Sequence, residues 1–195
     1  MNKGEQTRRR IIETAMAVLN RNGGEMSISE LMRDVNLEKG GIYRHFNGKD
    51  EIIAEAVTHY VGLVEDKLKQ ALAGRTSARE RLGAAITCLL SIAHAPITPG
   101  GCLVMNMAIS TQNTGSPAAA IVRRTFRRWE RLFAGELNKG MQAGEFRRDV
   151  ADSDFAALAI SSIEGAIMLT GARPALRAHD AVGRHLESVL DGYMT

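Results

Sequence analysis

Residues 37–46 read LEKGGIYRHF and form the most informative stretch of the chain. Ile42 and Phe46 are four residues apart, which places both on one face of a short helix, toward a core. The other faces carry basic, hydroxyl and imidazole groups, and the glycines Gly40 and Gly41 keep side-chain bulk away from whatever the helix approaches. The stretch therefore predicts a short surface helix that comes close to a partner.

A second short helix is expected just before this stretch. Ser27 and Glu30 have the spacing of a capping box, in which the serine oxygen accepts from the Glu30 amide and the carboxylate reaches back. Asn36 tolerates the left-handed conformation that a tight turn needs. Residues 27–34 and 38–45 are therefore predicted to form a helix-turn-helix, the motif that places its second helix in the major groove of DNA.

The net charge of +3 is unevenly distributed over the 195 residues. Residues 1–50 carry nine Lys and Arg against seven Asp and Glu, whereas residues 151–195 carry three against six. An acidic partner is therefore expected at the N-terminal end. We expect Asn47 to cap the next helix, so that Lys49 and the amide dipoles of that helix would together hold a phosphate.

The rest of the chain is predicted to be helical, because apolar residues recur at three- and four-residue spacing and no run alternates with period two. Glycines and prolines mark where helices end, and Ser116-Pro117 marks a start, with a capping serine before proline at the first helical position. The fold class is all-α. We expect helices at residues 6–22, 27–34, 38–45, 48–73, 77–95, 102–112, 117–141, 153–171 and 178–193.

Residues 82–122 contain no Asp, Glu, Lys or Arg. A membrane span needs roughly 20 consecutive apolar residues, and proline, glycine and polar residues interrupt this stretch, so we expect no membrane association. The stretch suits either a core helix with a shielded loop or the wall of a cavity for an apolar ligand. Two cysteines are too few for a disulfide scaffold, and the opening MNKGEQTRRR shows no secretory signal, so we expect a cytoplasmic protein.

Residues 8–53 resemble the DNA-binding domain of the tetracycline-repressor (TetR) family of bacterial regulators. The resemblance rests on Ile12, Ala15, Leu19, Gly23, Ser27-Ile28, Leu31, the run 37–46 and Lys49. It implies a three-helix helix-turn-helix DNA-binding domain at residues 1–47 and a helical effector-binding and dimerisation domain at residues 48–195, with the fourth helix linking the two. The DNA-binding residues that it implies are Ser27, Lys39, Gly40, Gly41, Tyr43, Arg44, His45 and Lys49.

Four residues depart from the family pattern. Asn36 stands where glycine is usual, and Met32 stands where alanine is usual. Glu38 replaces Ser or Thr, so we expect the recognition helix to lack a side-chain cap and the carboxylate to discriminate among bases. Gly41 replaces a small side chain, which softens this helix by about 0.5–1 kcal/mol relative to alanine.

The resemblance also implies a cavity for an effector among the middle helices. Methionine and aromatic side chains there would adapt to an apolar ligand, although the same spacing suits an ordinary core. Cys102 is either a redox or electrophile sensor or a small buried residue, and Glu164 either pairs with a neighbour or orients the ligand. The expected lining residues are Leu89, His94, Cys102, Met105, Phe126, Trp129, Phe133 and Glu164. We expect a solvated face of the seventh helix at Arg123, Arg124, Arg127, Arg128 and Arg131.

The helix at 153–171 is apolar on several faces and must be covered on more than one side. Its own core covers one side, and a second subunit is the best explanation for the other, with complete burial in a monomer as the alternative. By resemblance, this helix and the helix at 178–193 form a homodimer interface.

These features predict a homodimeric repressor that a small, largely apolar effector releases from a palindromic double-stranded DNA operator, with activation as the alternative outcome of the same binding. An enzyme would need Cys88 or Cys102 as nucleophile and His94 as base. The sequence holds no paired carboxylates, phosphate-binding glycine loop or metal-ligand cluster, so we expect no catalytic residue, metal or cofactor. A helical adaptor would leave the pattern of residues 39–49 unexplained.

Overall fold

The computed structural model describes residues 2–93 and 97–195. All the secondary-structure elements assigned in these ranges are helices, which confirms the all-α prediction. Contacts divide the chain into two compact units. The first unit is Met1–Leu63 with Ile97–Thr125, and the second is Val64–Pro96 with Phe126–Thr195. The predicted boundary at residue 47 separates a DNA-binding from an effector-binding part, whereas this division separates two packed units. The boundary at residue 47 stays a prediction.

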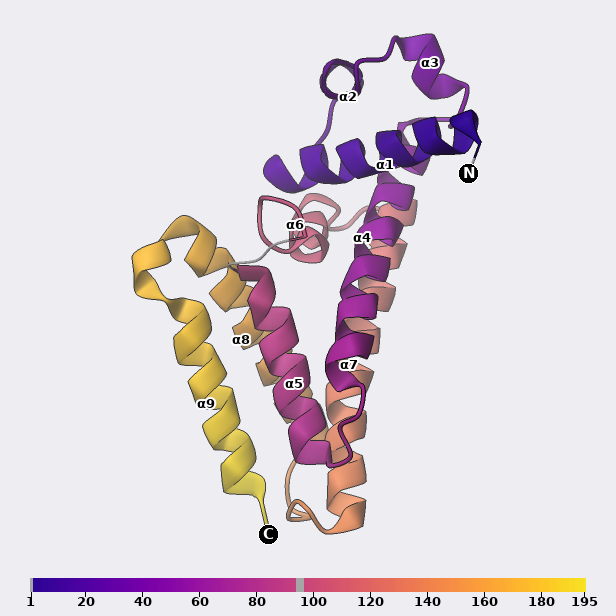
Figure 1. Ribbon diagram of the computed structural model, residues 1–195. Coiled ribbons are helices and arrows are strands. Elements are labelled where there is room, and N and C mark those ends of the chain that lie inside the picture. Colours follow the sequence, from indigo (N-terminus) through magenta and orange to yellow (C-terminus); the bar gives the residue numbers. More distant parts are fainter. Residues whose placement is uncertain (1, 94–96) are drawn as a thin grey trace. The chain divides into compact units, whose positions relative to one another are not determined.

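The first unit contains the three N-terminal helices, the start of the long fourth helix, and a segment from the middle of the chain (Figure 1). Its core is aliphatic: Ile11, Leu19, Leu31 and Ile42 are all fully buried. Helix α6 packs against α1, so residues distant in sequence complete this unit. Its helices are α1 (Lys3–Arg21), α2 (Ile28–Val35), α3 (Lys39–Tyr43), the first part of α4 (Lys49–Leu72), α6 (Leu103–Ser110) and the first part of α7 (Pro117–Ala143).

The turn between α2 and α3 follows the sequence prediction closely. Asn36 has φ 52° and ends α2 in the left-handed conformation. Ser27 caps α2 by accepting a hydrogen bond of 3.1 Å from the Glu30 amide. The reciprocal half of the predicted capping box is absent at this cap, because the Glu30 carboxylate instead accepts from Asn22 and Arg21.

The start of α1 and the cap of α4 differ from the prediction. Helix α1 begins at Lys3 rather than residue 6, because Asn2 and Glu5 form a capping box that holds the first turn. The predicted cap of α4 is wrong: the helix begins at Lys49, and the Asn47 side chain donates to the Glu51 carboxylate at 2.9 Å. The cap predicted at Ser116 is confirmed, since its hydroxyl accepts from the Ala119 amide at 3.2 Å.

The second unit holds the remaining parts of α4 and α7 and the C-terminal helices (Figure 1). Helices α5, α8 and α9 pack against one another, and Phe133 and Phe155 meet edge to face with ring centroids 6.3 Å apart. The expected helix 77–95 ends earlier, at Leu90, followed by a tighter 3₁₀ turn, and residues 94–95 lie outside the described chain. The elements are α5 (Ala78–Leu90), η1 (Ser91–Ala93), α8 (Asp152–Ala172), η2 (Pro174–Leu176) and α9 (Ala178–Tyr193).

Among the described helices, α8 alone is long and apolar enough to cross a membrane by length and composition. Half of its most apolar window is buried within the protein. Its exposed apolar side chains include Leu158 and Met168, at 65% and 56% exposure. This helix therefore has one packed side and one open apolar side.

Candidate nucleic-acid interface

Helix α3 is held by two buried anchors. Ile42 is fully buried and Phe46 is 3% exposed, as the four-residue spacing predicts. Arg8 of α1 lies over the Phe46 ring, 4.7 Å from its centroid, and pairs with Glu55 of α4. The recognition helix is thus fixed through its inner face, which leaves its outer face free to meet a partner.

The outer surface carries cations that the protein itself does not neutralise. Lys39, Arg44 and Lys49 are exposed, and none of them forms an ion pair within residues 2–93 and 97–195. By contrast, Arg21 and Arg33, on the neighbouring helices, both pair with Asp34. Uncompensated cations at a helix-turn-helix provide the electrostatic attraction that a phosphate backbone requires.

The other predicted contact residues around α3 differ in how far they are exposed to solvent. Tyr43, His45 and Gly41 are half-buried, whereas Gly40 is exposed. The Lys39 ammonium lies 6.0 Å from the centroid of the Tyr43 ring, at the limit of a cation–π contact. These positions allow the phenol and imidazole edges to contact a ligand while their rings rest on the protein.

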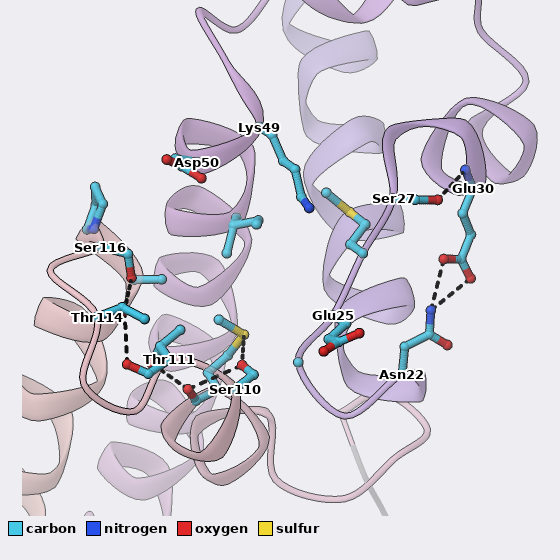
Figure 2. Close-up of a pocket in the computed structure, with 16 residues that line it drawn as sticks. Asn22, Glu25, Ser27, Glu30, Lys49, Asp50, Ser110, Thr111, Thr114 and Ser116 are labelled. Carbon is cyan, nitrogen blue, oxygen red and sulfur yellow. Dashed lines mark hydrogen bonds between the residues drawn. The ribbon is translucent and has the colours of Figure 1, made fainter.

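The N-terminal ends of α2 and α3 differ in their capping. Glu38 makes no side-chain cap hydrogen bond, as predicted from its replacement of Ser or Thr. Ser27 is exposed at the start of α2, with its oxygen already engaged by the Glu30 amide. Figure 2 shows the Lys49 side chain extending from the first turn of α4 into a pocket that Ser27 also lines.

A small charge network fixes α1 to α2 behind the interface. A hydrogen bond from Arg21 lowers the pKa of Asp34 below its ordinary value of 3.8. Hydrogen bonds from Asn22 and then Arg21 lower the pKa of Glu30 below its ordinary value of 4.5. The carboxylates of α2 are thus kept ionised and directed toward α1.

A helix-turn-helix whose second helix is anchored from behind and carries uncompensated cations outside defines a DNA-binding protein. Comparison with known proteins assigns the class. Residues 11–56 match the family described as "Bacterial regulatory proteins, tetR family", and residues 78–186 match "Tetracyclin repressor-like, C-terminal domain". The chain belongs to the TetR family of transcriptional regulators, which are DNA-binding proteins and not enzymes.

Relatives extend this similarity along nearly the whole chain. The chain is 28% identical over 166 residues to the uncharacterized HTH-type transcriptional regulator YxaF of Bacillus subtilis (strain 168), covering 84% of each protein. The crystal structure of a TetR regulator from Chloroflexus aurantiacus J-10-FL matches with a TM-score of 0.93 at 29% identity, covering 100% of this chain and 98% of that one. A TetR-family regulator from Cytophaga hutchinsonii matches with a TM-score of 0.87 at 27% identity and the same coverage.

The residues predicted to line an effector cavity fall into both units. Cys102 and Met105 belong to the first unit, Cys102 being 3% exposed at the start of α6. Phe126 and Trp129 meet edge to face on α7, with centroids 5.5 Å apart. His94 lies outside the described residues. The second unit contains Leu89, Phe126, Trp129, Phe133 and Glu164, all buried except the half-buried Phe126.

Trp129 lines a hollow of about 560 Å³ in the second unit. Of the predicted effector residues that the structure describes, Trp129 alone lines this hollow. Leu68, Leu72 and Leu132 supply apolar walls there. The indole Nε1 of Trp129 is buried without a hydrogen-bond partner among the described residues. The arginines predicted to form the solvated face of α7 are all exposed: Arg123, Arg124, Arg127, Arg128 and Arg131.

Sequence reasoning missed how residues 97–110 join the DNA-binding helices. Asn20, near the end of α1, is 1% exposed and donates from Nδ2 to the Thr98 and Gly101 carbonyls, both at 3.0 Å. Asn106 of α6 donates back to Asn20 Oδ1 at 2.8 Å. The signal available in the sequence was an asparagine on an otherwise apolar helix face, because a buried amide needs partners.

Proposed function

We propose that the protein is a homodimeric transcriptional repressor of the cytoplasm, which binds a palindromic operator and is released by a small, largely apolar effector. The observation that carries the proposal is the set of uncompensated cations on α3 and at the start of α4, namely Lys39, Arg44 and Lys49. Two such helices in a symmetric dimer would enter successive major grooves, about 34–36 Å apart.

The predicted contacts divide into two roles. Tyr43 and Lys49 would hold phosphates, while Lys39, Arg44 and His45 would face bases or the nearby backbone. Gly40 and Gly41 would let the helix approach the groove closely, and Ser27 would contact the backbone at the start of α2. Phosphate contacts set affinity and its salt dependence, whereas base contacts set sequence preference.

The first experiment is a salt series of binding to the DNA upstream of the gene and to a scrambled duplex of equal length. We expect tight binding to the upstream DNA alone, weakening as salt rises. Replacing Lys49 by alanine should weaken binding to both duplexes and reduce the salt slope by about 1. Replacing Arg44 by alanine should erode the preference between duplexes by about 1–3 kcal/mol.

A matched control uses a cation outside the interface. Arg148 is exposed in the second unit and forms no ion pair within the described chain. Arg148→Ala should therefore leave affinity, salt slope and preference unchanged. Equal losses in Arg148→Ala and Lys49→Ala, or unchanged DNA affinity in the double variant Tyr43→Ala/Lys49→Ala, would contradict the proposed interface.

The effector would bind in the second unit, where Trp129 borders an apolar hollow. Leu89, Phe126, Phe133 and Glu164 are the proposed neighbours from the same unit. Trp129 is the single tryptophan of the chain, so its fluorescence reports on this hollow without labelling. An uncharged apolar compound that releases the operator should also change the Trp129 emission, and release by such a compound without this change would argue against this location.

A further inference from the structure

The first unit contains a cavity of about 650 Å³ that none of the predicted effector residues lines (Figure 2). Its walls come from the α1–α2 connection, the start of α4, and the segment that runs from α6 into α7. A volume of this size falls within the range of small-molecule sites. All of its lining residues belong to the same compact unit as the recognition helix.

The inner part of the cavity is apolar. Met26, Met107 and Ala118 line it and are 4%, 1% and 3% exposed, respectively. Ile53, from the second turn of α4, adds a half-buried aliphatic side chain. Methionine side chains adapt to irregular apolar shapes, so this surface suits an alkyl or aromatic group.

The hydroxyl groups of the cavity are arranged to accept hydrogen bonds. Thr111 Oγ1 donates a hydrogen bond to the Met107 carbonyl at 2.5 Å, and Thr114 Oγ1 donates to the Thr111 carbonyl at 2.9 Å. Ser110 Oγ is also directed at the Met107 carbonyl, at 3.4 Å. A hydroxyl whose proton is engaged turns its lone pairs toward the cavity, and these partial negative charges attract a cation.

The charges around the cavity favour a cation. Glu25 and Asp50 are exposed carboxylates without an ion pair in the described part of the chain. The Glu30 carboxylate is occupied by Arg21 and Asn22. Figure 2 shows Glu25 and Asp50 on separate walls, with Lys49 the single basic residue among the lining. The two carboxylates without an ion pair therefore outnumber the one ammonium group of the lining, which leaves an excess of negative charge.

We propose that this cavity binds a small organic ammonium ion with an apolar body, and that its occupation weakens operator binding. The second half rests on the proposed function. Ser27 and Lys49 line the cavity and are also the proposed DNA contacts of α2 and α4. A ligand that fills the cavity and engages Asp50 holds the start of α4 in a state that is less favourable for Lys49 to reach a phosphate.

Methionine methyl NMR of the full chain tests the site directly. The chain has nine methionines, and Met26 and Met107 line the cavity, whereas Met168 is exposed on α8 in the second unit. With ¹³C-methyl methionine, benzyltrimethylammonium should shift the Met26 and Met107 signals saturably and leave Met168 and the Trp129 fluorescence unchanged. Unmoved Met26 and Met107 signals, or equal responses to benzoate or benzyl alcohol, would overturn the cation site.

Charge variants test the basis of recognition. In Glu25→Gln/Asp50→Asn, the affinity for benzyltrimethylammonium should fall about tenfold, which is about 1.4 kcal/mol, because both carboxylate charges are removed. Glu130→Gln, at an exposed carboxylate on α7 that lies outside the cavity, is the matched control and should leave the affinity unchanged. Equal affinities in the two variants, with unchanged melting temperatures, would contradict recognition by these carboxylates.

Operator binding in the presence of the probe tests the coupling. Saturating benzyltrimethylammonium should lower operator affinity by a factor of roughly 5–150, the usual range for linked sites. An unchanged or increased affinity would overturn the coupling while the methyl shifts stand. Absence of operator binding without the probe would instead overturn the proposed function, and the methyl titration would still decide whether the cavity binds the cation.

Discussion

The same substitution at two glycines of the first unit should have opposite effects on stability. A Cβ on Gly41 would lie 3.6 Å from Leu37 Cβ, an ordinary contact, and its helical backbone suits alanine. A Cβ on Gly100 would lie 2.2 Å from the Asn20 carbonyl oxygen, and its φ is +115°. We expect Gly41→Ala to stabilise the protein by about 0.5–1 kcal/mol and Gly100→Ala to destabilise it by about 2 kcal/mol or more.

Denaturant unfolding of the two variants measures this difference, and operator binding adds a second readout. If Gly41 serves close approach to DNA, Gly41→Ala should lose affinity while it gains stability. A variant that gains stability and keeps full affinity would show that α3 does not need Gly41 to approach the major groove.

A pH prediction follows from the Arg21 network. The pKa values of Asp34 and Glu30 are lowered in the folded state, so their contribution to stability is present above the ordinary carboxyl pKa values and is lost as pH falls through the folded values. Arg21→Gln should therefore unfold more easily than the parent at pH 7, and the difference should shrink as pH falls below the ordinary carboxyl pKa values of 3.8 and 4.5 and both carboxyls become protonated. Thermal melts across this range measure the difference.

The control for this prediction is Arg10→Gln. Arg10 is an exposed cation on the same helix and makes no ion pair within the described residues. It should follow the parent at every pH. A gap between Arg21→Gln and the parent that stays constant until both carboxyls are protonated would mean that Arg21 stabilises the protein by packing rather than by charge.

At the scale of elements, the connection between α1 and α6 depends on one pair of amides. Removing the Asn106 side chain leaves the buried Oδ1 of Asn20 without its donor. An unsatisfied buried acceptor costs about 1–3 kcal/mol. We expect Asn106→Ala to lose stability in this range and to expose the α6 amides to hydrogen exchange.

Gln142→Ala is the matched control, because Gln142 makes its amide hydrogen bond to Asn138 on an exposed part of α7. It should change stability by less than about 0.5 kcal/mol. Similar hydrogen exchange of α6 in Asn106→Ala and in the parent would contradict the role of Asn106 in holding this helix.

The sequence predicted the turns and helix ends that depend on residues close together in the chain. The turn at Asn36, the cap at Ser27 and the start at Pro117 all follow from local backbone chemistry. The packing of residues 97–110 on α1 could not be predicted, because Asn20 and Asn106 are 86 positions apart and no local pattern pairs them. The cavity beside Lys49 escaped prediction for the same reason, since three distant segments form its walls.

At the scale of the whole molecule, recognition of a palindrome requires two copies of the chain. The proposed dimer would use the exposed side of α8. Leu158, Ser161, Gly165 and Met168 follow one another there at three- and four-residue spacing, which places them along one stripe. Leu158 and Met168 are more than half exposed, although they are large and apolar. Small residues between them would let a second helix approach closely.

The dimer proposal therefore predicts that a charge on this stripe separates the subunits. In a symmetric interface Leu158 occurs twice, so Leu158→Glu removes two apolar contacts and buries two carboxylates. A loss of about 3 kcal/mol raises the dimer dissociation constant roughly 100-fold.

Ile109→Glu, at a residue 59% exposed on α6, is the matched control and should remain dimeric. Sedimentation velocity measures both variants, and operator binding should fall in Leu158→Glu, because a monomer presents one recognition helix to two half-sites. A Leu158→Glu protein that sediments as the parent does would place the subunit interface elsewhere.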